Sequence, residues 1–251
     1  MENQREQHTV LAEAVHRFER RLEGFNFGDY WDLREIMEAL PHVKMKEGYS
    51  LDGYYAGDWR NATMKMYACA TDSLDEYDPA VPEVRTRWFD AAKRKATPSP
   101  VPFRDGQVIV GTIPYSASKT VPPLEKYLDI DFTPEAIWEA MLLVVEACSY
   151  LPHRWHGSYA RGVLVVDVES LAECCEGKVD RAIWSPFLED SRLIPSVTML
   201  SENEARIHYC RWGEWSGLYC IDILAAREGR SLAFGAPEQH ALIEYDCGIV
   251  L

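Results

Sequence analysis

The sequence has no long apolar segment. Its longest run of strongly apolar residues covers 141–145, whereas a helix needs about 20 apolar residues to span a bilayer. Residues 2–7 are all polar, and the start of the sequence lacks the apolar stretch of a secretory signal. We therefore expect a cytoplasmic protein that has no membrane as a partner.

Basic residues are few. The 251 residues include 26 Lys and Arg against 40 Asp and Glu, which gives a formal net charge of −14. Nucleic-acid binding depends on basic side chains that neutralise phosphates, so the charge balance predicts no nucleic-acid partner. An acidic chain attracts basic proteins, although excess acid also serves solubility alone. The 47% hydrophobic content is that of a folded globular protein.

Complete catalytic motifs are missing as well. No C-x-x-C, H-E-x-x-H or Walker pattern occurs. Ser116 and Lys119 have the spacing of the serine acylases, but that chemistry needs a helix, which Pro122 and Pro123 forbid. We therefore assign no catalytic residue and no cofactor.

The cysteines and histidines leave a metal site open as an alternative, either at His153 and His156 or on the C-terminal strands. His208 and Cys210 project from the same face of a predicted strand, and Cys220 faces Cys210 across a turn at 213–217. Such a set resembles a zinc site, but cysteine is also a common small buried hydrophobe. Without a complete ligand set, we expect no metal. The odd count of seven cysteines indicates free thiols and a reducing compartment.

A second alternative is a metal-assisted hydrolase. Asp167 ends an apolar strand and Glu169 follows two residues later, where an α/β nuclease or phosphatase places metal-binding carboxylates. Histidines near them in the fold would complete that site. The same residues also suit a strand that leaves the core and caps the next helix.

Apolar periodicity predicts an α+β fold, in which amphipathic helices pack on a largely antiparallel sheet and a strand-rich meander forms the C-terminal part. Helical spacing marks residues 1–24, 29–40, 82–96, 134–148 and 170–176. Strand patterns mark 43–55, 62–70, 108–114, 163–168, 197–200, 205–212, 218–225, 232–234 and 242–246. We expect a single domain over 1–251, with a possible internal boundary at the proline-rich residues 97–102.

Aromatic residues are numerous, and several of them stand among turn residues and acids. Exposed Trp rings anchor protein interfaces, and acidic groups steer a basic partner toward them. This pattern predicts a partner-binding surface. Its members are Trp59, Asp75, Glu76, Asp78, Glu169, Glu173, Trp212, Glu214 and Trp215.

One segment resembles a known family. Residues 51–59 read LDGYYAGDW and lead to Tyr67 and Ala68 on a following element. This segment resembles the start of some immunity proteins of bacterial polymorphic toxin systems, in the group paired with restriction-endonuclease-fold toxins. The resemblance implies a non-enzymatic α+β toxin inhibitor that masks the basic active surface of a nuclease-type toxin.

Overall fold

The computed structural model describes residues 2–23, 34–56, 63–70, 124–147, 162–213, 216–229 and 231–244. The helix predicted at 82–96, the strand at 108–114 and the boundary at 97–102 lie outside these residues. The pair Ser116 and Lys119 also lies outside them. Within the described ranges, the α+β prediction is confirmed.

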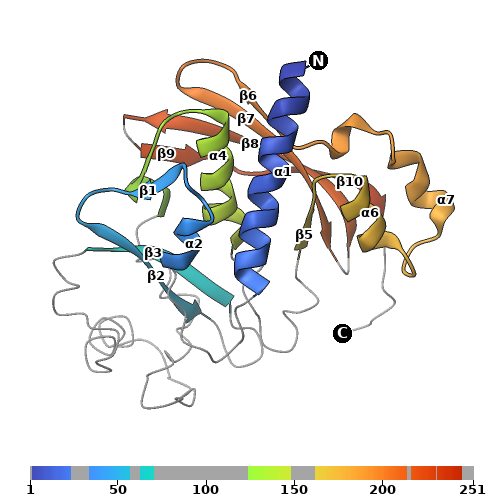
Figure 1. Cartoon of the computed structure of the whole chain (residues 1–251), viewed down its shortest axis with the longest axis horizontal. Coiled ribbons are helices and arrows are strands. Elements are labelled where there is room, and N and C mark those ends of the chain that lie inside the picture. Colours follow the sequence, from blue (N-terminus) through green and yellow to red (C-terminus); the bar gives the residue numbers. More distant parts are fainter. Residues whose placement is uncertain are drawn as a thin grey trace, which may run out of the picture.

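The C-terminal part forms a six-stranded antiparallel sheet (Figure 1). Its two long central strands, β7 (Glu204–Gly213) and β8 (Gly217–Glu228), are joined by a tight turn. Each central strand is flanked by two shorter strands. The flanking strands are β5 (Gly162–Val165) and β6 (Ser196–Met199) beside β7, and β9 (Ser231–Phe234) and β10 (Glu238–Glu244) beside β8. The predicted meander is therefore confirmed.

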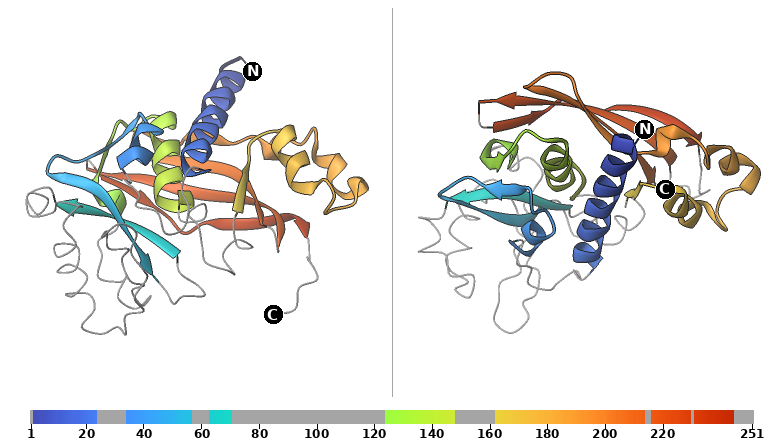
Figure 2. Two further views of the ribbon diagram at one scale, coloured as in Figure 1. Left: turned by 60° about the horizontal axis from the view of Figure 1, so that its bottom comes forward. Right: turned by 45° about the horizontal axis from the view of Figure 1, so that its top comes forward.

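Two helices cover one face of this sheet. Helix α1 (Glu2–Glu23) buries Leu11, Val15 and Phe18 completely, as the spacing of its apolar residues predicts. Helix α4 (Pro134–Met141) continues as the π-helical turn η4 (Leu142–Glu146) and lies between the sheet and the N-terminal strands (Figure 2). Trp138 of α4 donates from Nε1 to the Leu11 carbonyl at 3.0 Å, which ties the two helices together.

The N-terminal strands form two small antiparallel sheets. The strand predicted at 62–70 is confirmed, because β3 (Thr63–Ala70) pairs in antiparallel fashion with β2 (Tyr49–Ala56). The single strand predicted at 43–55 is wrong, since a turn with Gly48 at φ +82° divides it. The first half, β1 (Val43–Met45), pairs instead with β4 (Leu128–Ile130). Two short helical segments precede these strands in the chain. They are α2 (Arg34–Glu38), before β1, and η3 (Leu124–Tyr127), directly before β4.

A second core covers part of the opposite sheet face. It is built by the chain between β5 and β6, which forms four short helical segments. These are α6 (Val168–Cys175), α7 (Arg181–Trp184), η5 (Ser185–Phe187) and η6 (Ser191–Leu193). Leu171, Trp184 and Leu193 from this segment pack with Trp212 and Leu218 of the central hairpin. The assignment of Trp212 to an exposed docking surface is therefore wrong, because its side chain is fully buried on β7.

No helix within the described ranges has both the length and the apolar character that a membrane crossing requires.

The N-terminal cap of α4 gives a first testable prediction. Thr133 Oγ1 accepts from the backbone N–H of Ala136 at 3.3 Å, and Pro134 opens the helix as predicted. We expect Thr133→Ala to lower the free energy of unfolding by about 1 kcal/mol, because a backbone N–H loses its acceptor. Urea denaturation measures the change. Thr133→Ser keeps the oxygen, so equal losses in the two variants would contradict the role of the cap.

Candidate functional site

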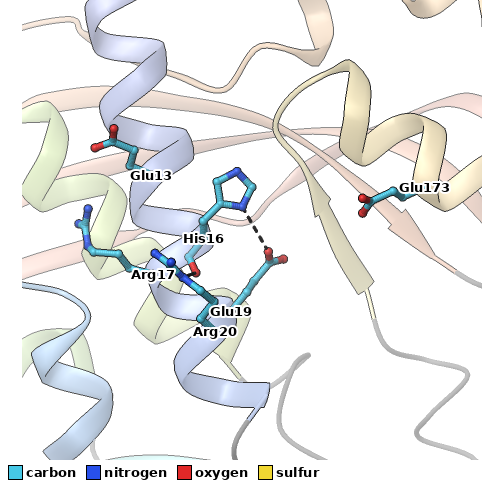
Figure 3. A pocket seen from close by; sticks show the side chains of 6 residues that line it. All are labelled: Glu13, His16, Arg17, Glu19, Arg20 and Glu173. Carbon is cyan, nitrogen blue, oxygen red and sulfur yellow. Dashed lines mark hydrogen bonds and ion pairs between the residues drawn. The ribbon is translucent and has the colours of Figure 1, made fainter.

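A polar groove lies between helices α1 and α6. It has a volume of about 680 Å³, and Figure 3 shows Glu173 of α6 on the side opposite α1. The lining side chains are Glu13, His16, Arg17, Glu19, Arg20 and Glu173. The groove therefore joins residues that are more than 150 positions apart in the sequence.

Helical periodicity explains how these side chains reach the groove. On α1, residues 13, 16, 17 and 20 follow the spacing of one helix face, opposite the buried Leu11, Val15 and Phe18. On α6, Glu169 and Glu173 are both exposed and stand one turn apart, so they share a face. The polar faces of both helices thus supply charged groups to one region.

The charge balance of the groove is acidic. Arg17 donates from a guanidinium nitrogen to Oε1 of the buried Glu139 at 2.9 Å, so a carboxylate behind the groove neutralises its charge. Arg20 donates from Nε to the His16 carbonyl at 3.1 Å. The lining contains three carboxylates, those of Glu13, Glu19 and Glu173, and one other arginine, and Glu19 lies 4.0 Å from His16 Nδ1. This balance favours a cationic ligand.

The structure places only some of the predicted partner-binding residues. Glu169 and Glu173 are exposed on α6, and Glu173 lines the groove. Trp59, Asp75, Glu76, Asp78, Glu214 and Trp215 lie outside the described residues. Sequence reasoning missed Glu13 and Glu19 on α1, although the polar face of the predicted helix at 1–24 was the signal that marks them.

Asp167 and Glu169 are the carboxylates of the hydrolase alternative. Asp167 lies at the N-terminal cap of α6, and Glu169 is exposed in the first turn of that helix. Asp167 accepts from the backbone N–H of Ser170 at 2.7 Å, and the backbone N–H of Asp167 donates to Ser170 Oγ at 3.1 Å. This reciprocal pair caps α6. His16 Nε2 lies 3.9 Å from Asp167 Oδ2. Within the ranges that the structure describes, neither carboxylate belongs to a group of three close metal-ligating side chains.

Such a group does occur on the central hairpin. His208, Cys210 and Cys220 have donor atoms that all lie within 4.8 Å of one another. The register of β7 and β8 pairs Cys210 with Cys220 and His208 with Asp222. The two sulfur atoms are 2.8 Å apart, and His208 Nδ1 lies 3.1 Å from Asp222 Oδ1. The structure thus assembles the set that the sequence analysis left open.

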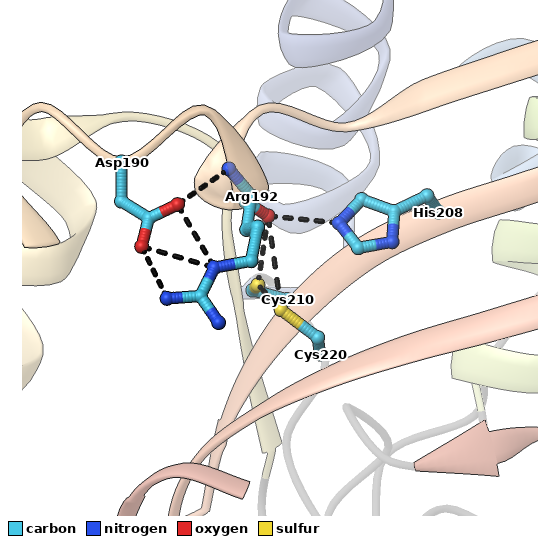
Figure 4. Close-up of polar contacts among 5 residues, drawn as sticks. All are labelled: Asp190, Arg192, His208, Cys210 and Cys220. Carbon is cyan, nitrogen blue, oxygen red and sulfur yellow. Dashed lines mark hydrogen bonds and ion pairs between the residues drawn. The ribbon is translucent and has the colours of Figure 1, made fainter. Parts of the chain in front are cut away.

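The carbonyl oxygen of Arg192 lies against all three donor atoms (Figure 4). It is 2.9 Å from His208 Nε2, 3.1 Å from Cys210 Sγ and 3.8 Å from Cys220 Sγ. Segment η6 carries this carbonyl over the sheet. The guanidinium of Arg192 turns to Asp190, whose carboxylate it contacts at 2.6 Å and 3.0 Å.

The cluster also changes the acidity of its own members. Hydrogen bonding to Cys220 raises the pKa of His208 to about 9, against the opposing effect of burial, and the Arg192 carbonyl and Asp222 add to the rise. The hydrogen bond from Cys210 lowers the pKa of the Cys220 thiol, and His208 and Arg192 lower it further. The pKa of Cys210 is raised, first by its bond to Cys220 and then by burial.

No family model, curated protein or solved structure matches this chain. The resemblance of residues 51–59 to immunity proteins stays a prediction. Function is therefore argued below from the geometry of the chain itself.

Proposed function

We propose that this protein is a non-enzymatic binding protein whose α1–α6 groove receives a basic surface of a partner protein. The acidic groove carries the proposal. Two elements that are distant in the sequence bring Glu13, Glu19 and Glu173 to one hollow, with Glu169 on the adjoining face of α6. Acidic side chains that serve only solubility do not need to gather from two helices in one groove.

The ion pair of Arg17 with Glu139, behind the groove, is a second observation that supports a basic partner. Glu139 is buried and holds Arg17 by an ion pair of 2.9 Å. The positive charge of Arg17 is therefore balanced within the protein, and the lining keeps its negative excess. Complementary charge of this kind accelerates encounter with a basic partner.

The most specific form of the proposal is an immunity protein of an antibacterial toxin system. Its partner would be a nuclease-type toxin, because a nucleic-acid cleft is basic and an acidic inhibitor masks it by occupying that surface. The net charge of −14 and the resemblance at residues 51–59 support this form. An inhibitor of this type acts in the cytoplasm, which fits the free thiols of Cys175, Cys210 and Cys220.

The proposal is tested by neutralising the groove. The variant Glu13→Gln/Glu169→Gln/Glu173→Gln removes two negative charges from the groove and a third from the adjoining face of α6. With a cognate basic partner found by pull-down, we expect association to slow by about ten-fold and to depend less on salt. Dissociation should change little, because peripheral charges act mainly on encounter. Stopped-flow measurements over a range of ionic strengths give both rates.

A matched control separates the groove from net charge. Glu202, Glu204 and Glu238 are exposed and lie outside the groove lining. The variant Glu202→Gln/Glu204→Gln/Glu238→Gln makes the same change in net charge and should retain most of the association rate. Equal slowing by the two triple variants would contradict the groove as the binding site.

A further inference from the structure

We propose that His208, Cys210 and Cys220 form a zinc site, with the Arg192 carbonyl oxygen as the fourth ligand. This site lies on the central hairpin and is independent of the proposed binding groove. It replaces the expectation, drawn from sequence spacing, that the chain binds no metal. The ligand is a divalent, borderline-soft transition metal ion, for which two sulfurs and one imidazole are the preferred donors.

The strand register assembles the donor set before any ion binds. His208 and Cys210 are two residues apart on β7 and so share a face, and Cys220 lies directly opposite Cys210 on β8. A tetrahedral zinc site places its donors about 3.3–3.8 Å apart, given bonds of about 2.0–2.3 Å. The two sulfurs now lie 2.8 Å apart, so an ion requires them to separate by about 1 Å. The Arg192 carbonyl oxygen, now 2.9 Å from His208 Nε2 and 3.1 Å from Cys210 Sγ, must also withdraw by about 0.4–0.5 Å to become the fourth ligand.

Asp222 orients the histidine for this role. Its carboxylate lies 3.1 Å from His208 Nδ1, on the side of the ring away from the cluster. Histidines that bind metals generally donate their second ring N–H to a carboxylate or carbonyl, which directs the other nitrogen to the metal. Here that other nitrogen, Nε2, points to the Arg192 carbonyl at 2.9 Å. The imidazole is therefore held in the orientation that coordination requires.

Burial of two small hydrophobic side chains does not explain this arrangement. Cys210 and Cys220 pack in the second core, and packing alone would be served by any apolar residues at these positions. Packing of the two cysteines requires no histidine and carboxylate pair beside the sulfurs. It also requires no carbonyl oxygen in contact with all three side chains. Without an ion, the Arg192 carbonyl accepts hydrogen bonds from these groups. A metal ion would replace those hydrogen bonds with bonds to the same atoms.

The full chain, expressed without a histidine tag and kept in a reductant, tests the proposal by its metal content. We expect about one zinc per chain after dialysis against zinc-free buffer. Cys210→Ser and Cys220→Ser should lose it. Cys174→Ser removes a buried thiol outside the set, and His240→Ala removes the exposed histidine opposite Cys220 on β10. Both controls should retain the zinc.

Asp222→Asn keeps every ligand atom. It therefore tests the site even if the cysteine variants fail to fold. We expect its zinc affinity to fall about 10–100-fold in competition with a chelating dye, while the circular dichroism of the protein is unchanged. Cobalt substitution in the wild type should give thiolate-to-cobalt charge-transfer absorption. A wild type that binds no zinc, a Cys210–Cys220 disulfide under reductant, or loss of zinc from His240→Ala would overturn the proposed ligand set.

Discussion

Trp212→Ala is expected to lower the free energy of unfolding by about 3–5 kcal/mol. The indole is fully buried on β7 and packs in the second core with Leu171, Trp184 and Leu218. Truncation removes its buried apolar area and leaves a cavity that the surrounding strands fill only in part. Urea denaturation followed by far-ultraviolet circular dichroism measures the loss.

The matched control is an exposed residue on the neighbouring strand. Leu224 of β8 is 54% exposed, so Leu224→Ala should change the free energy of unfolding by less than about 0.5 kcal/mol. A similar loss in both variants would contradict the burial of Trp212. A stable Trp212→Ala protein that binds its partner more weakly would restore the docking role that the sequence predicted.

The error on Trp212 shows what a local pattern lacks. Residues 211–217 combine two tryptophans with glycines and Ser216, and this composition correctly predicted a turn between two strands. Trp212 nevertheless belongs to β7, where the helical segment between β5 and β6 covers its face of the sheet. That segment is distant in the sequence, so only tertiary packing decides whether the ring is exposed.

The metal-ligating cluster could be predicted in part. A short turn fixes the register of a hairpin, which is why Cys210 was correctly expected to face Cys220. The same register places Asp222 opposite His208, a signal that was available but not used. The Arg192 carbonyl could not be predicted, because it depends on how η6 crosses the sheet.

Less of the groove than of the metal-ligating cluster could be predicted from the sequence, because the groove forms only when α1 and α6 pack near each other. The amphipathic pattern of α1 located its buried face, and therefore also its polar face. The capping role of Asp167 at the start of α6 was likewise among the expected alternatives. The position of α6 beside α1 had no local signal, so Glu13 and Glu173 could not be assigned to one surface from the sequence.

Arg17→Ala is the second substitution for which we expect a large effect, a loss of about 3 kcal/mol in the free energy of unfolding. Glu139 is 1% exposed, and its carboxylate accepts from Arg17 at 2.9 Å and from the backbone N–H of His42 at 2.7 Å. Removing Arg17 leaves a buried negative charge without its ionic partner. The loss falls at the low end for broken buried pairs, because His42 still donates to the carboxylate.

Two further variants distinguish the pair formed by the partly exposed Arg17 and the buried Glu139 from an ordinary surface contact. Arg21 contacts Glu38 at 3.4 Å near the surface, so Arg21→Ala should cost less than about 1 kcal/mol. Glu139→Gln removes the buried charge, and without that charge Arg17 has little left to neutralise. The double variant Arg17→Ala/Glu139→Gln should therefore be more stable than the sum of the single losses predicts. Additive losses would mean that Arg17 stabilises the fold through its packing rather than through the charge of Glu139.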